Sequence, residues 1–233
     1  MNWIDNPVTR ALGRLCDLAV LNILWLVCCI PIVTIGASTS ALYSVMLKFV
    51  RNEEGYIVKG FLKGFKENFK KSTIIWLIMV ALGIIVVVDL WAISSMHLGA
   101  LDILFRGALI FVGFMVLCVS VYALPMTARY ENTIKQTLKN SVILSVAKLP
   151  YTILMCIVSF GPIIIAFLDA RLMVLGMLVG VMIGEAAVAW VNSHFLRKIF
   201  TIFEPEEGME SAGAEATIEV VETVEKIAIS ENE

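Results

Sequence analysis

Five apolar runs, each about as long as a bilayer is thick, constrain this chain more than any other feature. A helix needs roughly 20 apolar residues to cross the hydrocarbon core, and the runs cover residues 15–35, 73–93, 103–126, 151–168 and 172–196. Hydrophobic residues make up 59% of the chain and charged residues 16%, whereas soluble domains have roughly 45–50% and about 25%. The sequence therefore predicts an all-α fold, a polytopic membrane helix bundle with about five transmembrane helices and additional amphipathic interfacial helices.

The ends of the chain differ in character from these runs. Residues 1–14 read as an amphipathic lead-in helix, for which Asn6-Pro7 is a favourable start. Residues 15–203 form the predicted transmembrane domain. Ten of the 20 acidic residues fall in 204–233, and a segment so acidic is predicted to be a disordered cytoplasmic tail.

A break follows the first run. Pro31 removes a backbone donor and is expected to kink or end the helix. Residues 36–50 are apolar but too short to cross the bilayer. We expect them to lie along the membrane face; the alternative is that they dip into the bilayer as a re-entrant half-helix.

Two polar loops, at residues 48–71 and 127–150, carry most of the basic residues. In the first loop, Phe61, Phe65 and Phe69 recur every four residues, and lysines occupy other faces. This pattern predicts an amphipathic basic helix at the membrane surface. Such a helix can anchor the protein in anionic headgroups or dock a cytoplasmic partner. The candidate docking residues are Lys59, Lys63, Lys66 and Lys70.

The distribution of lysine and arginine predicts the orientation. The two polar loops together with Arg197 and Lys198 hold 13 of the 18 basic residues, and with five spans all three segments face the same side. Basic segments favour the cytoplasm, which places the N-terminus outside the cell and the C-terminus inside. In a competing arrangement, residues 36–50 also cross the bilayer, the number of spans is even and the N-terminus lies inside.

The last apolar run combines small and polar residues. Gly176, Gly180 and Gly184 repeat every four residues. They are therefore expected to form a flat stripe against which another helix packs closely, from the same chain or from a second copy. Glu185 lies beside this stripe, and Asn192 follows seven residues later on the same face.

Polar side chains within the apolar runs are candidates for a functional site. An ionisable group at that depth costs roughly 2.5–3.5 kcal/mol on insertion scales unless it is neutral or paired. The candidate intramembrane polar site consists of Asp17, Asn22, Glu185 and Asn192. Either Glu185 is protonated and hydrogen-bonds a neighbouring helix through Asn22 or Asp17, which is a structural role, or it takes part in substrate or proton movement.

The sequence contains none of the common motifs of soluble enzymes: a P-loop, GxSxG, HExxH and a dinucleotide fingerprint are all absent. Its five cysteines show no metal-binding spacing and are interpreted as small buried hydrophobes. Only two histidines, His97 and His194, are present. We therefore expect no enzymatic activity, no catalytic residue, no metal and no cofactor.

The segment LNILWLVCCIPIVTIGASTSALYSVMLKFVRNEEGY, continued by FLKGFKENFKKSTIIWL, resembles the YesL family of bacterial membrane proteins, also called DUF624. The later segment PMTARYENTIKQTLKNSVILSVAKLP is similar to a second loop of that family, and the resemblance covers about residues 2–200. The family has no established activity, so no catalytic residue carries over. Its members are often encoded beside carbohydrate ABC transporters and sensor kinases, which implies an accessory role in sugar uptake or its sensing.

Two functional hypotheses follow. The first is an accessory or scaffold protein of the bacterial plasma membrane, associated with carbohydrate ABC-transporter uptake or its sensing. Its expected partners are membrane lipid, permease subunits or a sensor kinase, and a second copy of the chain, but no nucleic acid. The alternative is a small transporter or channel that uses intramembrane Glu185 and Asp17, because many transporters bind ions at broken helices near the midplane.

Overall fold

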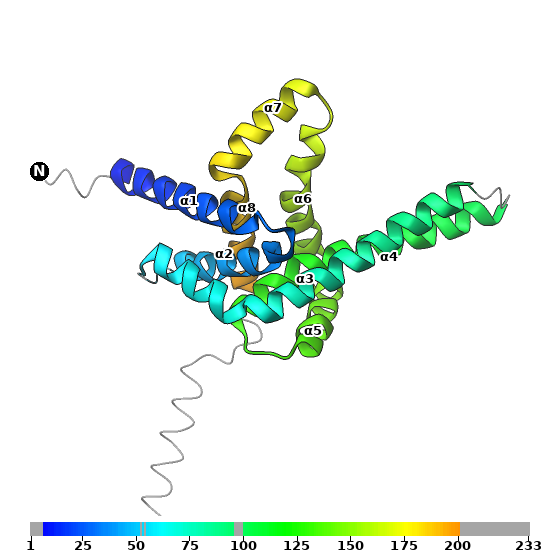
Figure 1. Ribbon diagram of the computed structural model, residues 1–233, viewed down its shortest axis with the longest axis horizontal. Helices are drawn as coiled ribbons and strands as arrows, with labels where there is room; N and C mark the ends of the chain where they lie inside the picture. The colour runs from blue at the N-terminus through cyan, green and yellow to red at the C-terminus, as the bar shows by residue number, and fades with distance from the viewer. Residues whose placement is uncertain (1–6, 52, 54, 96–99, 201–233) are drawn as a thin grey trace, which may run out of the picture. The chain divides into compact units, whose positions relative to one another are not determined.

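The computed structural model describes residues 7–51, 53, 55–95 and 100–200, and every regular element among them is a helix. The all-α prediction is therefore confirmed. The acidic tail 204–233, His97 and the first six residues of the lead-in helix lie outside the described residues. In chain order the elements are α1 (Pro7–Cys29), the 3-10 turn η2 (Ile32–Thr34), α2 (Ile35–Val50), α3 (Ile57–Ser95), α4 (Ala100–Arg129), α5 (Ile134–Ala147), α6 (Leu149–Ala166), α7 (Ala170–Val179), the π-helical turn η3 (Gly180–Gly184) and α8 (Glu185–Phe200) (Figure 1).

The chain divides into two units, Met1–Phe195 and Leu196–Glu233. Of the second unit the structure describes Leu196–Phe200, the last residues of α8. The helix packing and the candidate sites described below all lie within the first unit.

Helices α1 and α2 form a tight hairpin around Pro31, which lies two residues after the last residue of α1, so the helix ends beside the proline as predicted. The Thr34 hydroxyl closes the turn by donating to the Cys28 carbonyl oxygen at 2.6 Å. Across the hairpin, the Ser38 hydroxyl donates to the Trp25 carbonyl oxygen at 3.0 Å. Both bonds fix the reversal of the chain. The Cys28 carbonyl is one of the last four of α1, which have no helical partner, and the Thr34 hydroxyl satisfies it.

The open end of this hairpin brings α1 and α2 together. There the Arg14 guanidinium lies 5.7 Å from the centre of the Phe49 ring, so the early part of α1 and the end of α2 are neighbours. The returning segment Ile32–Val50 has 19 residues, about 28 Å of helix, which is long enough to run back alongside α1. The orientation of the termini across the membrane stays a prediction.

Helix α2 is the most deeply buried of the candidate spans. Within Ile32–Val50, 61% of the residues are buried, against 11–33% in the other five candidates. Its closest neighbour is the first half of α3, and the contact is made at two glycines. A Cβ at Gly36 would lie 2.5 Å from the Ser72 carbonyl oxygen, and one at Gly64 would lie closer than 3.0 Å to Ser44 Oγ. Helix α2 and the first half of α3 therefore touch along their backbones, which small residues permit.

Helix α3 is one helix of 39 residues, about 58 Å long. The predicted division into a basic surface helix and a separate span over 73–93 is therefore wrong. No proline interrupts Ile57–Ser95, and the apolar side of the basic half has a protein partner. Phe61, which was expected to face lipid, is 0% exposed in the part of α3 that packs on α2.

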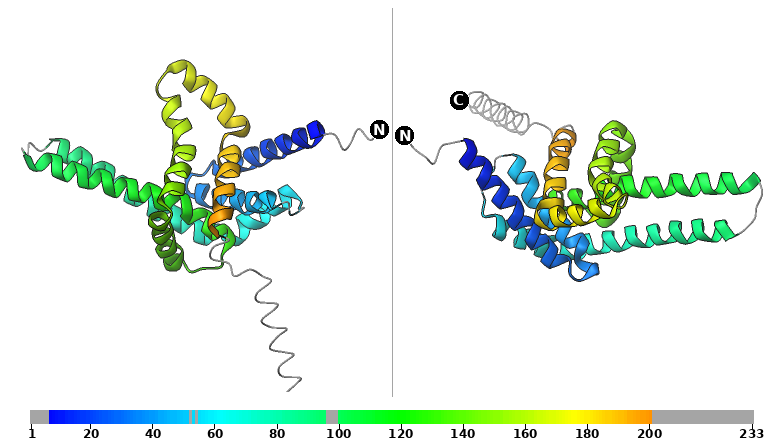
Figure 2. Two further views of the ribbon diagram at one scale, coloured as in Figure 1. Left: turned by 180° about the vertical axis from the view of Figure 1, so that it is seen from behind. Right: turned by 90° about the horizontal axis from the view of Figure 1, so that it is seen from above.

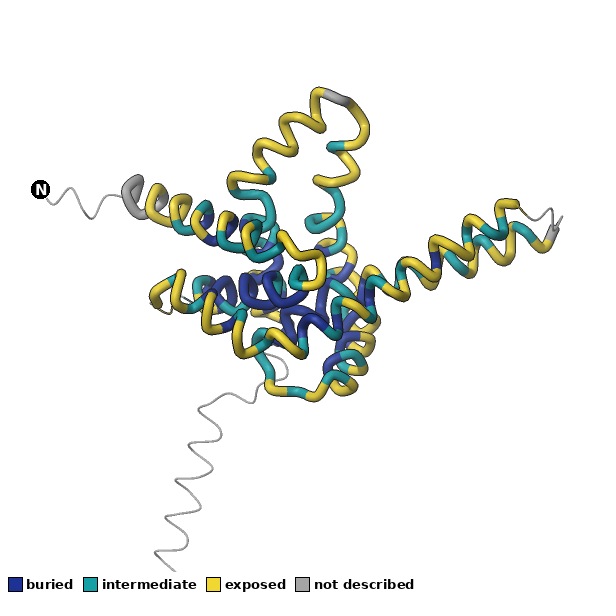
Figure 3. The backbone as a smooth tube through the Cα atoms, viewed as in Figure 1, coloured by how far each residue is buried: buried dark blue, intermediate teal, exposed yellow. Residues whose placement is uncertain are grey.

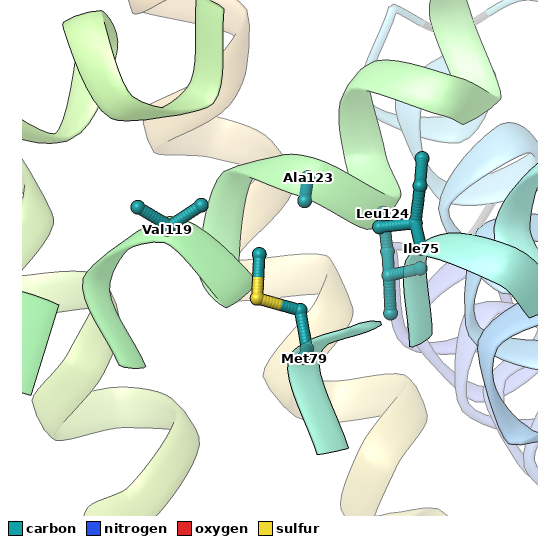
Figure 4. Packing of buried hydrophobic residues seen from close by; sticks show 5 residues of the cluster. All are labelled: Ile75, Met79, Val119, Ala123 and Leu124. Carbon is teal, nitrogen blue, oxygen red and sulfur yellow. The ribbon is translucent and has the colours of Figure 1, made fainter. Parts of the chain in front are cut away.

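The second half of α3 runs beside α4, and the two helices form a long hairpin (Figures 1 and 2). Beyond the packed region much of both helices is exposed (Figure 3), and many of the exposed residues are large and apolar. Apolar surface of this extent needs lipid or a partner to cover it. Five buried residues close the inner part of the hairpin: Ile75 and Met79 of α3 and Val119, Ala123 and Leu124 of α4 (Figure 4).

Helices α5 and α7 begin at side-chain caps. Helix α5, which lies in the second polar loop 127–150, begins with a capping box in which the Thr133 hydroxyl accepts from the Gln136 N–H and the Gln136 side chain accepts from the Thr133 N–H. Helix α6 and the run α7–η3–α8 form the last hairpin. Its turn is held by Asp169, whose carboxylate accepts from the Arg171 N–H at 3.0 Å.

Six helical segments are long and apolar enough to cross a membrane, judged by length and composition. Five overlap the predicted runs, and the sixth is Ile32–Val50, which contains α2. The architecture is therefore that of a polytopic helical membrane protein, as predicted. The number of segments that cross the bilayer stays a prediction.

Candidate intramembrane polar site

Asn22 of α1 is fully buried and holds the irregular turn η3 in place. Its Nδ2 donates to the carbonyl oxygens of Gly180 and Val181 at 3.0 and 2.7 Å, and its Oδ1 accepts from the Ala186 N–H at 3.1 Å. A π-helical turn interrupts the regular i−4 ladder, and in an apolar medium each freed backbone group needs another partner. The Asn22 amide supplies three of these hydrogen bonds.

The glycine stripe explains why the turn forms at this point. A Cβ at Gly180 would meet nothing within 4 Å, so the approach of Asn22 to the backbone does not depend on the missing side chain. At Gly176, by contrast, a Cβ would lie 3.2 Å from the Cβ of Ala166 in α6. One end of the stripe therefore lies against α6, and the η3 end contacts α1. Glycine also weakens a regular helix by about 1 kcal/mol relative to alanine, which makes the distortion less costly at Gly180–Gly184.

Asn192 of α8 is also fully buried and joins three helices. Its Nδ2 donates to the Tyr43 hydroxyl of α2 at 3.2 Å and to the Ser159 hydroxyl of α6 at 2.8 Å. Its Oδ1 is buried without a hydrogen-bond partner in the described part of the chain, and so is the hydroxyl of Ser193. A buried polar atom left unpaired costs roughly 1–3 kcal/mol. This point of the protein therefore keeps an acceptor that a water molecule, a ligand or a proton donor can satisfy.

Glu185 is the first residue of α8 and lies between the two asparagines along the chain. Its carboxylate is close enough to the Cys29 thiol of α1 and the Tyr43 hydroxyl of α2 to interact with them electrostatically. Among the described residues it forms no hydrogen bond or ion pair. Asn22 lies next to Glu185, as expected if the role of Glu185 is structural. However, Asn22 binds the backbone N–H of Ala186 and forms no hydrogen bond with the Glu185 carboxylate.

Asp17 does not join this group. It lies five residues before Asn22 on α1, about 7.5 Å away along the helix axis, and it forms no hydrogen bond or ion pair with any described residue. The structure therefore brings together three of the four predicted polar residues, Asn22, Glu185 and Asn192, and leaves Asp17 apart.

Two members of the site were missed from the sequence. Tyr43 lies in α2 and Ser159 in α6, and both were hidden within apolar segments. The hydroxyl of Tyr43 gave a usable signal, because a buried tyrosine normally needs a hydrogen-bond partner. No comparable signal marks Ser159, since a serine hydroxyl in a helix is commonly satisfied by its own backbone.

The four candidate docking lysines are divided by the structure. Lys59 and Lys63 line a cavity of about 310 Å³ between the end of α2 and the start of α3, together with Lys48. Lys66 and Lys70 are exposed on α3 and do not line this cavity. The spacing of the four lysines, four, three and four residues, places them all on one face of α3.

Long apolar helices that enclose hydrogen-bonded asparagines define a polytopic helical membrane protein. The sequence profile of the family described as "Protein of unknown function, DUF624" matches residues 18–90. The chain is also 30% identical over 159 residues to "Uncharacterized protein YteU" of Bacillus subtilis (strain 168), which covers 65% of this chain and 70% of that protein. No solved structure matches significantly. The chain belongs to the DUF624 family, as its sequence indicated.

The matched residues 18–90 include most of α1, all of α2 and most of α3. They contain Gly36 and Gly64, where α2 and α3 touch, and every residue that lines the cavity between the end of α2 and the start of α3. Asn22 also falls within them, whereas Glu185 and Asn192 lie outside.

Proposed function

We propose that the protein is a membrane accessory or scaffold subunit of a carbohydrate uptake system or its sensor, and that it docks its partner on the basic face of α3. The observation that carries this proposal is the way the basic half of α3 is held. Phe61 is fully buried and Gly64 lies against α2, so the helix is fixed, while Lys66 and Lys70 are exposed. A preorganised binding element loses little freedom on association, which favours affinity.

The chemistry of this face suits an acidic partner surface. Its described neighbours compensate the charge of this face only weakly. Among them Glu67 forms an ion pair with Lys63 at 3.8 Å, and the two side chains are 59% and 72% exposed. Exposed pairs of this kind contribute about 0–1 kcal/mol. Complementary charge on the partner would speed association and fix its register on the helix.

The proposal places the basic half of α3 in the cytoplasm, and the start of α1 on the same side. The positive-inside rule supports the first assignment. The contact of Arg14 with Phe49 supports the second. Helix α2 packs beside the lysine-bearing stretch of α3, and charged groups are costly within the hydrocarbon. This favours an interfacial rather than a membrane-crossing position for α2.

Affinity purification tests the docking role. The tagged protein is extracted from its native membranes in mild detergent, and the copurifying chains are identified by mass spectrometry. We expect permease or sensor-kinase subunits of a carbohydrate uptake system, and we expect the double substitution Lys66→Glu and Lys70→Glu to abolish their recovery. The matched control is Lys135→Glu and Lys139→Glu, which makes the same charge change on exposed positions of α5 and should retain them. Recovery of no such subunit, together with normal sugar uptake in a deletion strain, would refute the proposal.

A second candidate function is transport through the polar site. The observation that favours it is the helix break at η3 beside Glu185, which has no hydrogen-bond partner among the described residues. Purified protein in liposomes would be tested for proton and sugar flux, with Glu185→Gln as the variant. Asp17→Asn is the control, because it removes a carboxylate that lies outside the site. No flux, or equal flux in both variants, would argue against transport.

A further inference from the structure

The cavity between α2 and α3 has a composition that a docking surface does not require. Its volume of about 310 Å³ is at the lower end of the roughly 300–1,000 Å³ that small-molecule sites occupy. Its lining combines apolar side chains, Val45, Phe49 and Ile57, with the three lysines Lys48, Lys59 and Lys63.

The three lysines come from separate positions and converge on one space. Lys48 belongs to the last turn of α2, whereas Lys59 and Lys63 belong to the first two turns of α3. The described lining contains one acid, Glu53, and its carboxylate lies 3.4 Å from the guanidinium of Arg51. The cavity therefore carries a positive excess that no described carboxylate within it balances. Glu54 of the same loop lies outside the described residues.

Two of these ammonium groups are held only loosely by other contacts. The Lys59 ammonium lies 4.9 Å from the centre of the Tyr56 ring, and Tyr56 is itself 81% exposed and lines the cavity. Lys63 has the exposed pair with Glu67. Exposed cation–π contacts and exposed ion pairs contribute about 1 kcal/mol or less. An anion inside the cavity can therefore recruit both lysines at little cost.

We propose that this cavity binds a phosphate group carried by a small molecule or by a lipid headgroup. Lysine ammonium groups act as point charges toward phosphate, and three of them on separate turns can surround one phosphate. The apolar lining and the Tyr56 ring would cover the carbon part of the same ligand. This site shares Lys59 and Lys63 with the docking face, but it adds Lys48 and does not include Lys66 and Lys70.

The continuity of α3 limits where the phosphate can come from. Lys63 lies ten residues before Thr73, where the apolar run begins, which is about 15 Å along the helix. The headgroup layer on each side of the hydrocarbon is only about 5–7 Å thick. An upright α3 would therefore carry the cavity clear of the headgroups and toward soluble phosphates, whereas a strongly tilted α3 would bring it to the lipid.

The experiment separates these two sources. The full chain is placed in nanodiscs of phosphatidylcholine, and calorimetry measures the binding of inorganic phosphate, glycerol 3-phosphate and glucose 6-phosphate, with glucose as the uncharged control. In the lipid arm, the nanodiscs contain phosphatidylglycerol, and native mass spectrometry counts the retained anionic lipids. Three chains are compared in both arms: the unmodified chain, Lys48→Gln/Lys59→Gln/Lys63→Gln, and the control Lys66→Gln/Lys70→Gln/Lys71→Gln, which removes the same charge outside the cavity.

We expect one arm to show binding that the cavity variant weakens about tenfold, since three partly exposed lysines at about 0.5 kcal/mol each give this factor. The control variant should bind like the unmodified chain, and glucose should not bind. Should the triple variant fail to fold, Lys59→Gln against Lys71→Gln gives the same comparison at about twofold. The proposal is overturned if neither arm shows binding, or if cavity and control variants lose affinity equally. Because the docking test rests on Lys66 and Lys70, either idea can fail alone.

Discussion

Replacing Asn22 by leucine should separate α1 from the turn η3. The substitution removes three hydrogen bonds, of 3.0, 2.7 and 3.1 Å, to backbone groups of Gly180, Val181 and Ala186. Hydrogen bonds within membrane proteins are worth about 0.6 kcal/mol on average and at most about 1.7. Three bonds to groups that have no water available therefore give a loss of about 2–4 kcal/mol in the free energy of unfolding.

Reversible unfolding in mixed micelles, with increasing denaturing detergent and followed by circular dichroism, measures this loss. The control is Asn140→Leu in α5, because Asn140 is half-buried and forms no hydrogen bond with a described residue. Its free energy of unfolding should stay within about 0.5 kcal/mol of the unmodified chain.

A second variant tests whether Asn22 acts through the irregular turn. A π-helical turn holds one residue more than a regular turn, so deletion of Met182 should return Gly180–Gly184 toward an α-helix. In that background, Asn22→Leu should cost much less than in the full chain. If Asn22→Leu costs less than about 0.5 kcal/mol in the full chain, or if the two changes are simply additive, Asn22 does not stabilise the turn and the reasoning is refuted.

Three further predictions test the helix packing. Gly36→Ala should lower the free energy of unfolding by about 1–3 kcal/mol through overpacking. The control Gly83→Ala, where a Cβ would meet nothing within 4 Å, should be neutral or stabilise by up to about 1 kcal/mol. Equal effects of the two variants in detergent unfolding would contradict the close contact of α2 with α3. Thr133→Ala should cost about 1 kcal/mol and speed hydrogen exchange in the first turn of α5, and unchanged exchange would show that the capping box is not formed. Cysteines at Leu12 and Gly55, in a chain without its native cysteines, should react with an impermeant maleimide from the same side of sealed vesicles, and reaction from opposite sides would exclude the hairpin.

The helical class of this protein could be predicted because its main determinant is local. Apolar runs of about 20 residues and a proline at position 31 need no tertiary information to be interpreted. The division of α3 was predicted wrongly for a related reason. A change from basic to apolar composition near residue 72 marks a change of environment, not of backbone conformation, and a helix ends only where something competes with its next hydrogen bond.

The polar site could be predicted in part. The cost of a polar group at membrane depth identified Asn22, Glu185 and Asn192 as a set, and the structure brings them into one region. Which atoms they bind depends on the packing of α1 against η3, and a π-helical turn has no sequence signature of its own beyond permissive glycines. The partner of Asn192, Tyr43, lies 149 positions away along the chain, a separation that local pattern does not reach.

Helix α3 is continuous over its 39 residues, and we expect it to move as a rigid unit. Its first half contacts α2 at Gly36 and Gly64. Near its middle it packs against α4 through the buried cluster that contains Ile75. A force applied where the lysines lie would therefore tilt the α3–α4 hairpin, whose far end is about 38–54 Å away along the helix. Mechanical linkage between the two ends is thus inherent in the unbroken helix and requires no loop to move.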